Sequence, residues 1–349
     1  MSTDAVARDA FAQQAVWCAR LGSPFTASLM AAIGPALDRS TLTGRTILDW
    51  QGQADARADA VPLRLAGALH ALARRGAPEA LVRAYPPHPT PDLGALRRIV
   101  AETIAGQDET IAAWLASPPQ TNEVARSAVL HAGFMEIAAA TGLPLALFEL
   151  GASAGLNAIG DRYAYDLGGR RAGKAGAAVL LAPTWTGSPP AGDEPRIVAR
   201  RACDRAPLDI GKAVDRERLM AYVWADQAER LDRMQAAIAI ARTDPVPVEP
   251  ADAADWVETV LVSPPPAGIV RVLFHSIAYQ YFPDATKARI AAHLERLGAA
   301  AGRDTPVAWL AFEQFADEGP RLTLRLWPGG TERLLARGDA HGRAVNWLA

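Results

Sequence analysis

Cysteine is scarce in this sequence, which has only Cys18 and Cys203 among 349 residues. Two cysteines cannot build a disulfide framework, and no Cys-x-x-Cys pair is present for a zinc ribbon. The sequence also lacks clustered histidines and a His-Glu-x-x-His motif, so we expect no metal site. An excess of one charge is missing as well. The net charge of −2 provides no large electrostatic footprint for nucleic acid, and none is expected as a partner.

Long apolar runs are absent too. No run is long enough to cross a bilayer, and the N-terminus lacks the basic segment and apolar stretch of a signal peptide. We therefore expect a cytoplasmic protein without a membrane-embedded part. Half of the residues are hydrophobic, which is ordinary for a globular chain, and 349 residues suffice for two domains. The oligomeric state does not follow from these features.

The first 140 residues carry helical periodicity and no strand-like alternation. Apolar residues recur at helical spacing within 63–72, 96–115 and 124–137. Pro118-Pro119 breaks the chain before the last of these segments, and Gly142 ends it. The sequence thus predicts an N-terminal helical domain over residues 1–140.

The pattern changes at Leu145–Leu150, a continuous apolar run that predicts a strand buried on both faces. Strand-like and helical segments then alternate. The further predicted strands are 197–203, 245–249, 269–274 and 307–312, with helices over 215–242, 253–261 and 284–297. This alternation predicts an α/β, Rossmann-like domain with a mostly parallel sheet over residues 141–349.

The C-terminal tail has a different pattern. Arg321–Leu326 alternates strictly between leucine and polar residues, and Trp327-Pro328-Gly329-Gly330 is a turn sequence. Two short apolar segments, 334–335 and 345–348, follow it. We therefore expect the sheet to end in antiparallel strands.

The most specific local motif is Glu-Leu-Gly-Ala-Ser-Ala-Gly-Leu-Asn, which directly follows the first predicted strand. Small residues at alternate positions let the backbone turn tightly and let a ligand approach main-chain N–H groups, and we expect a helix to follow. The motif resembles the first motif of class I S-adenosylmethionine-dependent methyltransferases, acidic-x-Gly-x-Gly-x-Gly, with a serine in place of the middle glycine. This resemblance implies S-adenosylmethionine as the cofactor, bound by Glu149, Gly151, Ser153, Gly155 and Asn157.

Polar residues follow the later predicted strands, and ligands of open α/β sheets bind at the carboxyl ends of strands. The resemblance places Asp204 on the ribose hydroxyls and Asp252 near the adenine. His275 ends the fourth predicted strand. In the methyltransferases that the motif resembles, catalytic residues lie at this position, so we expect His275 to act as a base. We expect Tyr279 to orient the substrate and Glu313, at the end of the fifth strand, to face it.

A group of polar residues directly precedes the helix that leads into the first strand. We expect the helical domain to cover the site as a lid or substrate wall, with a small-molecule acceptor as the partner. The lid residues would be Gln120, Thr121, Asn122 and Arg126. Methyl transfer requires mainly in-line positioning of the nucleophile and, for some acceptors, a base.

Two other functions remain open. Gly151–Gly155 also fits the Gly-x-Ser-x-Gly nucleophile elbow of serine hydrolases, with Ser153 as nucleophile and Asp339 and His341 as partners. A hydrolase needs several strands before its elbow, and the first 140 residues supply none, so this hypothesis ranks below methyl transfer. Alternatively, the protein binds S-adenosylmethionine or a nucleotide without catalysis.

A wider resemblance covers nearly the whole chain. Its motifs are TNEVARSAVL, LPLALFELGASAGLN, DRYAYDLGG, RRACDRAPLD, VWADQAER, VLFHSIAYQYF and RLWPGG…DAHG. Together they resemble an uncharacterised bacterial family, domain of unknown function 2332. This family implies no established reaction, and fold alone does not fix function.

Overall fold

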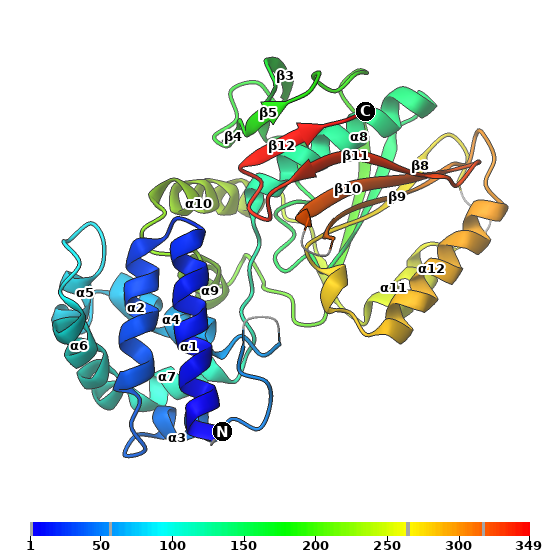
Figure 1. The fold of residues 1–349 in the computed structure, drawn as a ribbon. Coiled ribbons are helices and arrows are strands. Elements are labelled where there is room, and N and C mark those ends of the chain that lie inside the picture. The colour runs from blue at the N-terminus through cyan, green and yellow to red at the C-terminus, as the bar shows by residue number, and fades with distance from the viewer. Residues whose placement is uncertain (1–2, 56–57, 263–265, 316–317) are drawn as a thin grey trace. The chain divides into compact units, whose positions relative to one another are not determined.

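The computed structural model describes residues 3–55, 58–262, 266–315 and 318–349 (Figure 1). The chain divides into two units. Unit 1 comprises Met1–Thr121 and Ala213–Gln235, and unit 2 comprises Asn122–Lys212 and Ala236–Ala349. The second segment of unit 1 lies within the range 141–349 that the sequence predicts as a Rossmann-like domain.

All the regular secondary structure in the described residues of unit 1 is helical. Its helices are α1 (Thr3–Arg20), α2 (Pro24–Ala36), α3 (Leu42–Leu48), α4 (Val61–Arg75), α5 (Glu79–Ala84), α6 (Leu93–Gly106), α7 (Asp108–Leu115) and α9 (Ala213–Ala221). The helix predicted over 215–242 is in fact α9 and α10 (Ala228–Thr243), which are separate elements, and the boundary between the units falls within α10.

The segment 213–235 completes the core of unit 1. Within α4, His70 is buried, and its Nδ1 lies 3.0 Å from the carbonyl oxygen of Ala221. The carboxylate of Asp226 accepts hydrogen bonds from the Ser23 hydroxyl and, at 2.9 Å, from the Phe25 amide. These groups lie at the start of α2, where main-chain N–H groups have no partner within the helix. The first 121 residues therefore depend on a segment much later in the chain.

Unit 2 contains all the strands of the described residues. They are β1 (Leu145–Leu150), β2 (Ala164–Leu167), β3 (Arg170–Gly173), β4 (Leu180–Leu181), β5 (Thr184–Thr186), β6 (Ile197–Asp204), β7 (Val248–Pro250), β8 (Val270–Ser276), β9 (Val307–Gln314), β10 (Pro320–Trp327), β11 (Glu332–Gly338) and β12 (Ala344–Trp347). The helical elements wholly within unit 2 are η1 (Val124–Arg126), α8 (Ser127–Thr141), η2 (Gly160–Arg162), α11 (Ala253–Val260), η3 (Tyr279–Tyr281) and α12 (Asp284–Ala299).

The main sheet is mixed and mostly parallel. Its nine strands have the order β5-β12-β11-β10-β9-β8-β1-β6-β7. From β9 to β7 all neighbours are parallel, whereas β10 pairs antiparallel with β9 and β11, and β11 pairs antiparallel with β12. The α/β class, the N-terminal helices and the antiparallel C-terminal strands that the sequence predicts are confirmed.

Helices cover both faces of this sheet. On one face α8 packs through Phe134, whose ring meets that of Phe274 edge-to-face at 5.2 Å. On the other face α11 and α12 lie side by side (Figure 1) and bury a cluster that includes Leu273, Val257 and Ile290. None of the helices among the described residues has the length and apolarity to span a bilayer.

The connection from β1 to β6 differs from the expected one. No α-helix follows the glycine motif. Residues 151–159 form turns, η2 comes next, and the connection then builds a small sheet of order β3-β2-β4. The glycine loop thus lacks the helix N-terminus whose dipole stabilises anionic ligand groups in dinucleotide-binding folds.

Candidate functional site

The strand order reverses between β1 and β8. From β1 the chain continues to β6 and β7 on one side, and it then crosses to β8 and β9 on the other side. Loops that leave neighbouring strands in opposite directions open a crevice at their carboxyl ends, where open α/β sheets bind ligands. The loops at this position are the glycine loop, Gly151–Asn157, and the segment Ile277–Tyr279, which we call the β8 loop.

The glycine loop has a left-handed backbone at alternate residues. Gly151 has φ +64°, Ser153 +55° and Gly155 +73°. A Cβ atom on Gly151 would lie 2.6 Å from Cβ of Ala278 in the β8 loop, which is too close for two carbon atoms. Glycine at this position therefore allows both the turn and the close approach of the two loops.

Asp204, at the end of β6, holds the glycine loop in place. One carboxylate oxygen accepts the Ser153 amide at 2.9 Å, and the other accepts the Ala206 amide at 2.9 Å. Both oxygens are therefore engaged by main chain. The role on ribose hydroxyls stays a prediction, and a ligand would have to share these acceptors.

Glu149 is the penultimate residue of β1, and its side chain is only 2% exposed. Burial raises the pKa of this carboxyl to about 8. The negative charge of Asp204 adds to the rise, while the Ala158 amide and Arg126 partly offset it. Oε2 of Glu149 and the hydroxyl of Ser153 are buried without a hydrogen-bond partner among the described residues. Burial of such groups is costly, so a ligand that bonded to them would be stabilised.

Two asparagines connect the start of α8 to the glycine loop. Asn122 accepts the Leu156 amide at 3.0 Å, and Asn157 accepts the Ser127 hydroxyl at 2.8 Å. Both side chains are buried. In this structure they support the loop, and the predicted contact of Asn157 with a cofactor stays a prediction.

Arg126 joins two further segments at the same edge of the sheet. Its Nε donates to the carbonyl of Ala340 at 2.8 Å, and Nη1 donates to that of Ser276, the last residue of β8, at 3.1 Å. Of the predicted lid residues, Arg126 and Asn122 belong to unit 2, whereas Gln120 and Thr121 belong to unit 1. The lid itself stays a prediction.

His275 lies within an aromatic and acidic cluster on β8 and β9. Its Nδ1 is 2.8 Å from Oε1 of Glu313, and its Nε2 accepts the indole N–H of Trp309 at 2.9 Å. The ring of Tyr279 stacks on the imidazole with centroids 4.7 Å apart. Because Nε2 accepts, the proton of the neutral ring must be on Nδ1, which donates to Glu313. Neither nitrogen then has a free lone pair with which to take a proton from a substrate.

Glu313 also fixes the β8 loop. Oε1 accepts the amides of Ala278 at 3.0 Å and Tyr279 at 3.1 Å. Burial favours a higher pKa for this carboxyl, but the hydrogen bond from His275 and the two amides lower the pKa below its ordinary value. The loop begins at Ile277 with φ +49°, which is strained for a β-branched residue.

The predicted residues form two groups on opposite faces of the sheet. Glu149 is paired with Phe274, and Leu150 with His275. Side chains alternate between faces along a strand, so the Glu149 and His275 side chains point away from one another. The loops that follow the two strands approach each other at Ala278 and Gly151.

Asp252 lies outside both groups. It is the N-cap of α11, and Oδ1 accepts the amides of Ala254 at 2.9 Å and Asp255 at 3.4 Å. This bonding explains the residue as a helix cap. Its predicted contact with an adenine stays a prediction.

Trp309 was not among the site residues predicted from the sequence, although its hydrogen bond determines the tautomer of His275. The signal was present in the alternation of the fifth predicted strand, where residues 309, 311 and 313 share a face. The pairing of His275 with Ala311, which lies between Trp309 and Glu313 on that face, became known only with the register of the sheet.

The fold defines an α/β protein that joins a helical unit to a mixed, mostly parallel sheet. A comparison with protein families matches residues 8–347 to the family described as "Uncharacterized protein conserved in bacteria (DUF2332)", and the chain belongs to this family. The family resemblance seen in the motifs is thus confirmed. Comparison with curated proteins gives no match, and neither does comparison with solved structures.

Proposed function

We propose that unit 2 binds S-adenosylmethionine at the glycine loop and transfers its methyl group to a small-molecule acceptor. The observation that carries this proposal is the buried Glu149 carboxyl, whose Oε2 has no partner among the described residues, directly before a left-handed glycine loop. A cation at this position would provide the missing hydrogen-bond donor and would favour the ionised carboxylate.

The chemistry of S-adenosylmethionine matches this requirement. The molecule carries an ammonium and a sulfonium, and its methyl group is activated for transfer by the sulfonium. Glu149 would bind the ammonium, the left-handed turn at Gly151 would let the ligand approach the main chain, and Asp204 would keep the turn in shape. Acceptors that already have a free lone pair need only positioning, so the proposal does not require His275 to act as a base.

Calorimetric titration with S-adenosylhomocysteine, the stable demethylated product, tests the proposal. The unmodified protein should bind it, and Glu149→Gln should weaken binding by about tenfold, because a charge-assisted hydrogen bond becomes a neutral one. Glu332→Gln is the matched control, since this exposed carboxylate lies on β11, which does not pair with β1, and it should bind like the unmodified protein. Absence of binding at millimolar ligand would refute the cofactor hypothesis.

A serine hydrolase is the second candidate, and one observation favours it. Ser153 combines the Gly-x-Ser-x-Gly pattern with φ +55°, the strained backbone expected of a nucleophile on a sharp turn. Other features do not fit an elbow. The Ser153 hydroxyl is buried and lacks a histidine partner among the described residues, and no α-helix follows the turn. Binding without catalysis remains the third hypothesis, and turnover of the cofactor separates it from the first.

A further inference from the structure

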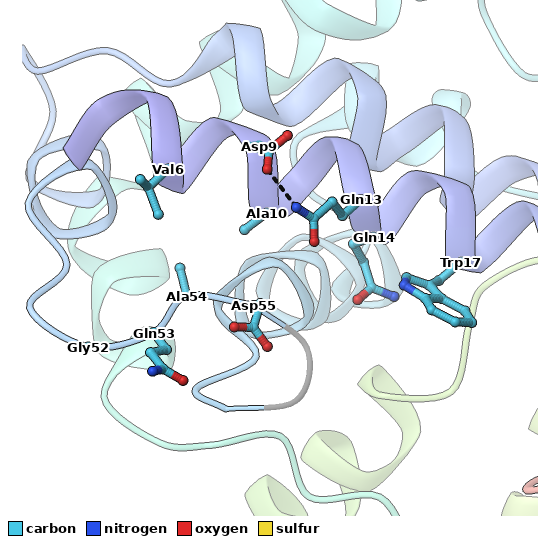
Figure 2. A pocket seen from close by; sticks show the side chains of 10 residues that line it. All are labelled: Val6, Asp9, Ala10, Gln13, Gln14, Trp17, Gly52, Gln53, Ala54 and Asp55. Carbon is cyan, nitrogen blue, oxygen red and sulfur yellow. Dashed lines mark hydrogen bonds between the residues drawn. The ribbon is translucent and has the colours of Figure 1, made fainter. Parts of the chain in front are cut away.

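Unit 1 contains a cavity of about 500 Å³ that has no part in the proposed function (Figure 2). It lies between one face of α1 and the segment Gly52–Asp55. Val6, Ala10, Gln13 and Trp17 follow one another along this face at helical spacing. The volume is in the range of small-molecule sites.

The floor and rim of the cavity differ in exposure. Ala10, Ala54 and Gln14 form a buried floor, with Gln14 only 5% exposed. Val6 and Trp17 lie on the rim and are 47% and 44% exposed. The cavity thus offers a floor that combines two alanines with the Gln14 amide, and an accessible indole.

Gln14 has a buried acceptor without a partner. Its amide Nε2 donates to Sγ of Cys18 at 3.4 Å, whereas Oε1 has no hydrogen-bond partner among the described residues. Figure 2 shows the side chain extending from α1 into the cavity, with this oxygen on the side of Asp55. A buried carbonyl oxygen in this state is stabilised by any ligand that donates to it.

The described residues that line the cavity carry charge of one sign. Asp9 and Asp55 are among them, and none of these described lining residues is basic. The Gln13 amide already donates to Asp9, which orients that carboxylate (Figure 2). On the rim, the guanidinium of Arg20 lies 5.6 Å from the ring centroid of Trp17, so this indole already attracts a cation.

We propose that this cavity binds a small organic cation, an ammonium or guanidinium group on a short apolar chain. The cationic group donates to Oε1 of Gln14 and is neutralised by Asp9 and Asp55. Its apolar chain covers Ala10 and Ala54 and reaches the indole of Trp17. This site is independent of the glycine loop, which belongs to unit 2.

Agmatine, which carries a guanidinium and an amine on a four-carbon chain, is the probe. It should bind to the full chain in a calorimetric titration. The matched ligand 4-guanidinobutyrate has the same guanidinium but ends in a carboxylate, and it should bind at least about tenfold more weakly because Asp9 and Asp55 repel it. Equal binding of both ligands, or binding of neither, overturns the proposal.

Three variants locate the site. Gln14→Met removes the acceptor without removing volume and should weaken agmatine about tenfold, while the melting temperature stays level or rises because an unpartnered polar atom is gone. Asp55→Asn should weaken binding several-fold. The control Glu102→Gln removes one exposed charge of unit 1 outside the cavity and should have no effect.

Arg57 lies outside the described residues and close in sequence to the cavity. The titration is therefore repeated with Arg57→Ala, which removes this cationic side chain from the comparison. Agmatine should then bind as tightly as before or more tightly. Wild-type affinity in Gln14→Met, or loss of agmatine binding in Glu102→Gln, would overturn the assignment.

Discussion

Trp309 donates its indole N–H to Nε2 of His275 at 2.9 Å, and this single bond determines the tautomer of the histidine. The Nδ1 proton then points to Glu313, which in turn holds the amides of the β8 loop. A histidine bonded in this way positions a loop and has no lone pair for a substrate proton. The sequence-based expectation of a base at His275 therefore requires Trp309 to move during the reaction.

The first prediction concerns this tautomer. The neutral His275 imidazole should carry its proton on Nδ1, because Nε2 is occupied by the indole donor. Nitrogen-15 NMR of the labelled protein measures this directly through the shifts of the two ring nitrogens. Trp309→Phe is the control, since it removes the donor and should change the Nε2 shift. A proton on Nε2 in the unmodified protein would contradict the assignment.

The second prediction concerns the contact between the two loops. Gly151→Ala should lower the free energy of unfolding by about 2 kcal/mol, because the new Cβ both meets Ala278 and forces a left-handed alanine. Ala278→Gly in the same chain should recover the part due to the clash and leave about 1 kcal/mol due to the backbone. Chemical denaturation of the two single variants and the double variant measures the coupling. Purely additive effects would show that the loops do not touch.

Glu149 gives the third prediction. The folded chain keeps this carboxyl protonated up to about pH 8, whereas the unfolded chain releases the proton near the ordinary value of 4.5. Between these values the folded state binds more protons, so stability falls as pH rises, by at most about 1.4 kcal/mol per pH unit. Glu149→Gln should remove this contribution and be the more stable protein at pH 8.

Denaturation of both proteins at several pH values between about 5 and 8 provides the measurement. Only the difference between the two curves is used, since other groups such as the buried His70 titrate in both proteins. Parallel curves would mean that Glu149 is ionised in the folded chain.

The fourth prediction concerns Ser153, which distinguishes the serine hydrolase hypothesis from methyl transfer. Ser153→Gly should raise the free energy of unfolding by about 1 kcal/mol, because glycine adopts φ +55° without strain, whereas Ser153→Ala retains the strain. A fluorophosphonate probe should not label the unmodified protein, since the hydroxyl is buried and lacks a histidine partner among the described residues. Stoichiometric labelling that disappears in Ser153→Ala would favour the hydrolase.

Much of the main sheet could be predicted from the sequence. The first strand begins and ends at the predicted residues, Leu145 and Leu150, because a run buried on both faces is continuous and is bounded here by Pro144 and Gly151. The strands that begin at Ile197 and Val307 also start where predicted. Strands β2 to β5 were not predicted, because segments of two to four residues carry no measurable alternation.

The site was predictable only in outline. Polar residues at the ends of β1, β6, β8 and β9 lie at one edge of the sheet, as parallel strands require. Their partners were not predictable, because each comes from elsewhere in the chain or from the main chain itself. Asp204 binds the amide of Ser153 and His275 binds Trp309, and these pairings depend on register and loop shape rather than on local pattern.

Unit 1 is built from two separate segments of the chain, and this has a consequence during protein synthesis. Its first segment ends at Thr121, and the segment that completes its core begins at Ala213. At about 5–20 residues per second, synthesis of the intervening stretch takes on the order of 5–20 s. During this time α2 lacks the Asp226 carboxylate and α4 lacks the Ala221 carbonyl. The N-terminal helices must therefore stay protected from aggregation, within the cell, until a segment from the middle of the chain arrives.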